Sequence, residues 1–406
     1  MKKNGYRSMD LDVKLERRDF LKIGGGSLLG AGLLLGRPPL WGQEAAKPEP
    51  PARPRTNIDE ALAVPRTKSS LPGLFPGKVA AVKDERAMSD QGVNGKVVGS
   101  MFEKGMLGLT GKPLAASFNL FFDKKDVVGI KVNPVGAGLI ATRLEVVDAI
   151  VAWLRQGGIP AAHIVIWDRF DYMLADAGFT AARYPGIAIE GLQTMDEAAA
   201  EGKSDDDSRW LGKDGRHVSE KNFDLDCYYY ADVEAPQDKP YLNQHVFNGK
   251  HSYFGKLLTR KLTKIINVPV FKNTGNGVSM ATKNLGYGAV CNTSRLHRPL
   301  FFDVCTEVLA FPVLRDKLVL NVTDGLRAQY DGGPGPLAQA TWFLNTLYFA
   351  TDPFALDMTC HNLIVEKRKA MKVQVNEHPK YSEYLRYAER LGLGVADPAR
   401  ISFVQA

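Results

Sequence analysis

Two short apolar segments on either side of an amphipathic one constrain the fold more than any other part of this sequence. Residues 126–132 (DVVGIKV) and 163–167 (HIVIW) have the length and β-branched composition of buried strands. Between them, apolar residues recur at helical spacing over 144–154. Thr142 and Glu145 have the spacing of a capping box at the start of this helix. A strand, a crossover helix and a second strand predict a parallel βαβ unit.

Short apolar runs and amphipathic segments continue to the carboxyl end of the chain. Further strands are expected at residues 78–82, 186–190, 264–271, 317–323 and 344–350, and further helices at 95–109, 171–177, 254–260, 299–310 and 381–391. Asp352-Pro353 predicts the start of another helix, with Asp352 as its N-cap. We therefore expect an α/β fold, with a mixed, largely parallel sheet flanked by helices.

Composition divides the chain into three parts. Residues 1–43 predict an export signal, the Pro-rich residues 44–71 predict a mobile linker, and residues 72–406 predict the α/β domain. Within that domain, residues from about 191 to 250 are polar and predict an insertion. One strand is expected inside the insertion, at 226–233.

The export signal is predicted from Arg17-Arg18, followed by Phe20-Leu21-Lys22 and a Gly/Leu-rich run. The run, residues 23–36, is shorter than the roughly 20 apolar residues that span a bilayer. This combination is typical of a twin-arginine signal, so we expect the twin-arginine export machinery as a partner. We also expect a location in the periplasm or at the cell-envelope exterior. Residues 41–46 contain no clean cleavage site, which leaves an uncleaved membrane tether as an alternative.

Charge and cysteine content narrow the function classes. Residues 1–43 hold eight Lys/Arg and four Asp/Glu, so they supply +4 of the formal charge of +7. The remainder is too weakly basic to indicate nucleic-acid binding. Cys227, Cys291, Cys305 and Cys360 form no C-x-x-C motif, which argues against an iron–sulfur cluster but leaves disulfides and free thiols open. The identity of any cofactor stays open, with a divalent metal as one alternative.

Polar residues stand at the ends of the predicted core strands. They are Lys131 and Asn133, Asp168, Lys272 and Asn273, Asp324, and Asp352. If the strands are parallel neighbours, their carboxyl ends lie along one edge, where open α/β sheets bind ligands. Lysines and amides suit an anionic or carbonyl-bearing ligand, whereas carboxylates suit a metal ion or proton transfer.

Residues 264–297 carry the densest part of this pattern, with Lys-Asn pairs at 272–273 and 283–284 next to glycines that let backbone approach a ligand. The candidate catalytic residues are Lys131, Lys272, Asp168, Asp324 and His297. The candidate ligand-binding residues are Asn133, Asn273, Gly275, Gly277, Lys283 and Asn284. Asp357 and His361, four residues apart on one helix face, are candidate metal ligands.

Several of these candidates also have a structural explanation. Asp324 precedes a glycine, a common turn pair, and Asp168 can pair with the arginine that follows it. A helical ion pair is the simpler and preferred explanation of the candidate metal ligands. Lys131 and Lys272 are harder to explain structurally, because a lysine buried in an apolar strand is costly without a partner.

Five segments and one histidine form a recognisable set: GIKVN at 129–133, IVIWDR at 164–169, NVPVFKNTGNGVSMATKNLGYG at 267–288, His297, TDGLRAQYDGGPG at 323–335 and TDPFALD at 351–357. Together they resemble the family known as domain of unknown function 362, in its twin-arginine-exported branch. The resemblance covers most of residues 75–370 and implies an α/β fold without an established activity. Some relatives carry added ferredoxin-like cysteine motifs, which this chain lacks.

We therefore expect an exported enzyme that acts on a small anionic metabolite through a Lys/Asn/Asp cleft at the strand carboxyl ends. In this hypothesis the lysines hold or polarise the ligand and the asparagines hydrogen-bond it. The alternative is a non-catalytic exported protein that uses the same cleft to bind a ligand or to mature a cofactor.

Overall fold

The computed structural model describes residues 53–193, 222–233, 250–297 and 300–406. The predicted export signal at 1–43 lies outside these residues, as does most of the predicted insertion.

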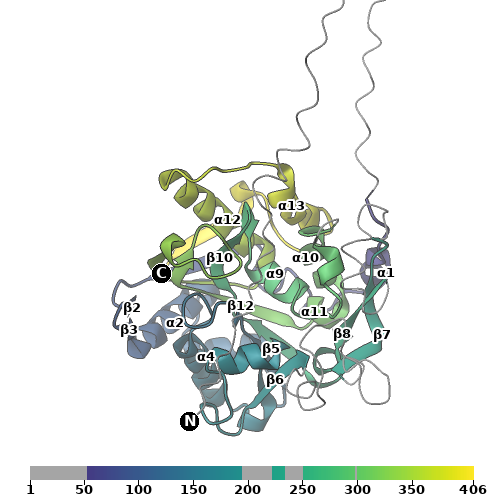
Figure 1. Cartoon of the computed structure of the whole chain (residues 1–406). Coiled ribbons are helices and arrows are strands. Elements are labelled where there is room, and N and C mark those ends of the chain that lie inside the picture. The colour runs from purple at the N-terminus through teal and green to yellow at the C-terminus, as the bar shows by residue number, and fades with distance from the viewer. Residues whose placement is uncertain (1–52, 194–221, 234–249, 298–299) are drawn as a thin grey trace, which may run out of the picture. The chain divides into compact units, whose positions relative to one another are not determined.

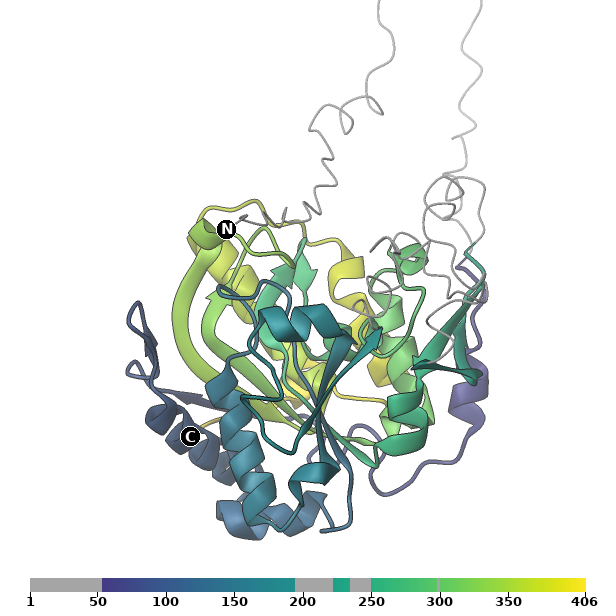
Figure 2. The ribbon, with the colours of Figure 1, turned by 60° about the horizontal axis from the view of Figure 1, so that its bottom comes forward.

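A mixed sheet forms the centre of the described chain and confirms the predicted α/β fold. Its strands follow the order β14 (Ser402–Gln405), β1 (Lys78–Lys83), β13 (Thr341–Ala350), β12 (Leu318–Gln329), β9 (Lys264–Asn267), β4 (Val128–Lys131), β5 (Ile164–Phe170) and β6 (Ala188–Gln193). From β12 to β6 all neighbours are parallel, whereas β13 is antiparallel to both β12 and β1. Figure 2 shows β12 and β13 as a long, curved, light-green pair.

Helices cover both faces of the sheet (Figure 1). One face carries α2 (Gly95–Thr110), α3 (Leu114–Phe121) and α4 (Leu144–Gln156); the other carries α9 (Ala281–Gly286), α10 (Asp303–Glu307), α11 (Pro312–Arg315) and α13 (Glu383–Arg390). Successive side chains of β5 point to opposite faces of the sheet, so they pack into two different core layers. Ile164 and Ile166 pack toward α4, whereas Val165 and Trp167 pack into the opposite core.

A third core region surrounds α12 (Pro353–Ala370), which packs against β1, β10 (Val270–Thr274) and β13. The predicted cap of this helix is confirmed, because the Asp352 carboxylate accepts hydrogen bonds from the backbone N–H groups of Phe354 and Ala355. Short elements complete the fold: α5 (Asp171–Asp176), β2 (Met88–Ser89), β3 (Gly92–Val93) and β11 (Gly277–Val278).

A small hairpin of β7 (Phe223–Tyr230) and β8 (His251–Gly255) lies beside α1 (Ile58–Ala63), at the right of Figure 1. Ile58 and Ala61 are buried in the same core cluster as residues of this hairpin. The described part of the stretch predicted as a linker therefore packs on the domain.

Three predictions about local structure are wrong. The helix expected at 254–260 is instead the end of β8 followed by a π-helical turn, Leu257–Lys261. The single strand expected at 264–271 is split into β9 and β10 at Pro269, which cannot donate to a ladder. The strand expected to end at Thr323 continues to Gln329, because Gly325 allows a register shift while β13 keeps pairing with it.

The predicted capping box of α4 is also wrong. The N-cap of this helix is Arg143, without a side-chain cap. The Thr142 hydroxyl instead accepts from the backbone N–H of Asn133 at 2.8 Å and donates to the Val268 carbonyl at 2.8 Å. Thr142 therefore ties the loop after β4 to the loop after β9.

No helix in the described ranges combines the length and apolar character needed to cross a membrane. The described residues include all four cysteines, and each is a free thiol.

Candidate functional site

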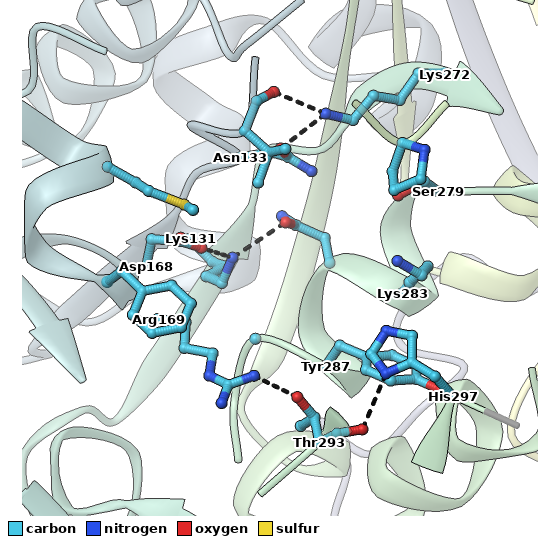
Figure 3. A pocket seen from close by; sticks show the side chains of 16 residues that line it. Lys131, Asn133, Asp168, Arg169, Lys272, Ser279, Lys283, Tyr287, Thr293 and His297 are labelled. Atoms are coloured by element: carbon cyan, nitrogen blue, oxygen red, sulfur yellow. Dashed lines mark hydrogen bonds and ion pairs between the residues drawn. The ribbon is translucent and has the colours of Figure 1, made fainter. Parts of the chain in front are cut away.

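A cavity of about 190 Å³ lies at the carboxyl ends of β4 and β5, between them and β10 and α9 (Figure 3). The strand order reverses at this point. The chain adds β5 and β6 on one side of β4 and then places β9 on its other side. Ligands bind at such switch points in open α/β sheets. The lining residues are Lys131, Asn133, Val135, Asp168, Arg169, Phe170, Met173, Lys272, Ser279, Lys283, Asn284, Tyr287, Gly288, Thr293, His297 and Pro334.

Lys131 forms a buried ion pair with Asp168 on the floor of the cavity. Its Nζ donates to the Asp168 carboxylate, to the Asn284 side-chain oxygen at 3.0 Å and to the Val132 carbonyl at 2.8 Å. Burial lowers the pKa of Lys131, and the Asp168 charge opposes that shift. Three acceptors match the three N–H bonds of an ammonium, so this lysine has no donor left for a ligand.

A chain of buried amides fixes the orientation of Asn284. Its side-chain N–H donates to the Asn267 oxygen at 2.8 Å, and Asn267 donates to the Asn321 oxygen at 2.9 Å. Asn321 in turn donates to the carbonyl of Ala350 at 3.3 Å. Because a carbonyl can only accept, the direction of every amide in the chain follows. The Asn284 oxygen must therefore face Lys131.

Lys272 is fully buried yet has only neutral partners in the described part of the chain. Its Nζ donates to the Asn133 side-chain oxygen at 3.1 Å, the Val135 carbonyl at 2.9 Å and the Ile140 carbonyl at 3.4 Å. Burial, followed by the positive charge of Lys283, lowers the pKa of Lys272 to about 7. This lysine can therefore exchange a proton near neutral pH.

Lys283 extends from α9 toward the cavity, as Figure 3 shows. Its Nζ lies 5.2 Å from the ring centre of Tyr287 and 5.5 Å from that of Phe301, so its contacts are cation–π contacts. Among the described residues it makes no hydrogen bond and no ion pair. Burial lowers the pKa of Lys283. Its ammonium N–H bonds are available to an anion in the cavity.

Three further polar groups lining the cavity make no hydrogen bond to the described residues. They are the side-chain nitrogen of Asn133, the second carboxylate oxygen of Asp168 and the hydroxyl of Ser279. Together with Lys283 they offer two nitrogen donors, one hydroxyl and one acidic acceptor. This set can bind a ligand that carries both an anionic group and a second polar group.

Arg169, Thr293 and His297 form a connected group at the mouth of the cavity (Figure 3). The Arg169 guanidinium donates to the Thr293 hydroxyl and to the Gln193 side-chain oxygen. His297 is exposed, and its Nδ1 lies 3.1 Å from the Thr293 carbonyl oxygen. The structure thus brings His297 to the rim rather than into contact with the floor.

The cavity brings together seven of the sequence-predicted residues: Lys131, Asn133, Asp168, Lys272, Lys283, Asn284 and His297. Gly275 lines a neighbouring cavity, which also touches His297. Asn273 holds the loop after β12, since its side-chain oxygen accepts from the Gly333 N–H at 3.0 Å. Gly277 lies against the ring of Phe302.

Two predicted strand-end carboxylates lie away from the cavity. Asp324 lies within β12 and accepts from the backbone N–H groups of Arg143 and Leu326. Burial raises the pKa of Asp324. Asp352 follows β13, which runs antiparallel to β12, so the expectation that its strand end shares the ligand edge is wrong.

Asp357 and His361, the candidate metal ligands, also lie outside the cavity. The Asp357 carboxylate accepts from the N–H groups of Ala281 and Thr282 and from the Thr282 hydroxyl, so it anchors the start of α9. Burial raises the pKa of Asp357 to about 6. Within the described ranges, no three His, Cys, Asp or Glu side chains cluster in a way that could hold a metal ion.

Sequence reasoning missed several lining residues, of which Ser279 is the most informative. It lies between β11 and α9, and its backbone N–H donates to the Lys272 carbonyl at 2.9 Å. Only the spacing Lys272-x₆-Ser279-x₃-Lys283 in one glycine-rich segment could have suggested it. Phe170, Met173, Tyr287 and Pro334 carried no recognisable signal.

A family model described as Domain of unknown function (DUF362) matches residues 230–362. The matched segment includes β10, α9 and the β12–β13 pair, and so contains Lys272, Ser279 and Lys283. Searches of curated proteins and of solved structures found no match.

Proposed function

We propose that this protein is an enzyme that acts on a small anionic metabolite in the cavity between β4, β5, β10 and α9. The observation that carries the proposal is the Lys283 ammonium, which faces the cavity with no acceptor among the described residues. Three lysines and one carboxylate meet there, and that carboxylate already neutralises Lys131. A bound anion would supply a negative counter-charge for the other two lysines, Lys272 and Lys283.

The groups around the cavity divide into three roles. Lys283 binds the anionic group of the ligand, with the Ser279 hydroxyl beside it. The Asn133 side-chain nitrogen and Lys272 act on a neighbouring polar group, where Lys272 can donate or accept a proton near neutral pH. The Lys131–Asp168 pair holds the floor of the cavity in place and leaves one Asp168 oxygen to accept a hydrogen bond.

A ligand screen tests the anion site. Small carboxylates and phosphate esters would be screened by thermal shift, and binders would be followed by NMR for turnover. Lys283→Met should weaken the binding of an anion about tenfold or more, because a charge-assisted hydrogen bond is lost. Lys367→Met is the matched control, since Lys367 also lies over two aromatic rings, those of Tyr330 and Trp342, but outside the cavity. Equal affinity of wild type and Lys283→Met would contradict the proposal.

The alternative is a non-catalytic protein that binds the same ligand or helps to mature a cofactor. Lys272→Met separates the two functions. An enzyme should lose turnover while it retains most of its ligand affinity, because Lys283 is unchanged. Binding without turnover in the wild type, over all binders found, would favour the alternative.

We further propose that the protein belongs to the twin-arginine-exported branch of the family and works in the periplasm or at the cell-envelope exterior. The support comes from Arg17-Arg18 and the Gly/Leu-rich run that follows. Replacing both arginines with lysine should retain the protein in the cytoplasm, measured by fractionation against a cytoplasmic marker. Unchanged export of the double variant would rule out this route.

A further inference from the structure

Lys131 and Lys272 both stand at the end of an apolar strand, but their electrostatic surroundings in this cavity differ. Lys131 donates to a carboxylate and two neutral oxygens, so its ammonium form is compensated. Lys272 donates only to neutral oxygens, and the positive charge of Lys283 lowers its pKa more than the Asp168 charge raises it. A buried ammonium with no directly bonded counter-charge is unfavourable, so burial shifts Lys272 toward the neutral amine.

The hydrogen bonds of Lys272 suit the neutral amine. An amine has two N–H bonds, which match the two shorter contacts, at 2.9 Å to the Val135 carbonyl and 3.1 Å to the Asn133 side chain. The third contact, at 3.4 Å to the Ile140 carbonyl, is the longest and the one an amine would give up. The nitrogen lone pair is then free for reaction. A lysine desolvated beside another cationic group is a recognised form of activated nucleophile.

We infer that Lys272 forms a Schiff base with the carbonyl carbon of a small oxo acid whose carboxylate lies on Lys283. The inference rests on the proposed function and specifies its substrate class. Lys283 is the anchor because its ammonium faces the cavity and has no acceptor among the described residues. An oxo acid fits because it places a carbonyl group one or two carbons from a carboxylate.

The reaction is balanced by the groups present. The Lys272 lone pair forms a C–N bond, and the π electrons of the carbonyl move to its oxygen, which takes up a proton as the nitrogen loses one. The nitrogen then gives up its second proton and forms C=N while the C–O bond breaks, and that proton, taken up by the oxygen, lets it leave as water. The Asn133 side-chain nitrogen can donate to the oxygen of the intermediate. The unpaired Asp168 oxygen can accept and return the transferred proton.

Reductive trapping tests this inference on the full chain. The protein would be incubated with pyruvate and sodium cyanoborohydride, which reduces the C=N bond, and digested for peptide mass spectrometry. We expect one reduced pyruvate adduct on Lys272, formed at a rate that saturates with pyruvate. Acetone, which has the carbonyl but no carboxylate, should react about tenfold more slowly or worse, because it cannot bind Lys283.

Lys317 provides an internal control in the same digest. Its Nζ also donates to two backbone carbonyls, Leu258 at 2.5 Å and Leu262 at 2.7 Å, and burial lowers its pKa, but it lies outside the cavity. Equal labelling of Lys272 and Lys317 would show unselective chemistry and overturn the inference. In Lys283→Met, saturation by pyruvate should be lost while slow labelling by acetone remains.

The inference and the proposed function can fail separately. If pyruvate, 2-oxoglutarate and acetoacetate bind in a Lys283-dependent way but leave no adduct on Lys272, the covalent step is wrong and the anion site stands. If other anions bind and no oxo acid does, the substrate class is wrong. If no anion binds at all, the proposed function fails as well. The wild-type labelling map decides the covalent step even if a Lys272 variant does not fold.

Discussion

The unpaired burial of Lys272 predicts a pH dependence of stability that Lys272→Met should remove. The pKa of this lysine falls from its ordinary 10.5 to about 7 on folding. Between these two values the unfolded chain holds a proton that the folded chain lacks, so stability rises with pH. At about 1.4 kcal/mol per pKa unit, the full shift corresponds to roughly 5 kcal/mol. An experiment from about pH 6 to about pH 9 covers the lower part of this range, so the wild type should gain roughly 3 kcal/mol over it.

Urea unfolding of the wild type and Lys272→Met at several pH values between these limits would measure the effect. The variant also leaves three carbonyl oxygens without their donor, so its absolute stability is not the quantity to compare. The difference between the two proteins isolates the lysine, because other titrating groups contribute to both. That difference should shift toward the wild type as the pH rises. Parallel pH profiles would refute the claim that Lys272 is buried without a directly bonded counter-charge.

Three further substitutions test the surroundings of the cavity. Gly288→Ala would place a Cβ 2.6 Å from Cε of Lys131 and should weaken ligand binding. The control Gly99→Ala on α2 has open space around it, so it should leave binding unchanged and stabilise the helix by about 0.5–1 kcal/mol. Asn267→Ala breaks the buried amide chain and should lower the free energy of unfolding, measured in urea, by roughly 3 kcal/mol. The control Asn362→Ala changes an exposed residue and should lower it by less than about 0.5 kcal/mol. Asp357→Ala removes the acceptor of three hydrogen bonds at the start of α9 and should cost roughly 3 kcal/mol by the same assay while also weakening ligand binding.

The sequence predicted those features of the site that follow from local pattern. β4 and β5 are short apolar runs, so their ends could be placed, and a parallel pair brings those ends together. Lys131 and Asp168 lie at these ends and meet as expected of strand-end neighbours. The N-cap role of Asp352 was equally local, since an Asp-Pro pair before an apolar helix face is sufficient to indicate it.

The features that could not be predicted depend on contacts between distant segments. Asn267 and Asn321 each occur in an apolar strand with no motif around them, and only the pairing of β9 between β4 and β12 brings them into one hydrogen-bond chain. Asp324 was predicted to end a strand because a glycine follows it, but pairing with β13 carries the strand onward. Asp357 and His361 share a helix face as expected. The fold, however, packs α9 against Asp357, so its carboxylate binds backbone N–H groups of that helix.

The different chemistry of the two buried lysines arises from one break in a strand. Lys131 is paired in register with Trp167, so the next residue of β5, Asp168, lies within reach of its ammonium. Residues 264–271 do not continue as one strand beside β4. Pro269 ends β9, and β10 pairs with β12 instead, which directs Lys272 to the carbonyls of the loop after β4. Two strand-end lysines thus differ in their direct partners, because the fold places the Asp168 carboxylate in hydrogen-bond contact with Lys131 and gives Lys272 only neutral oxygens.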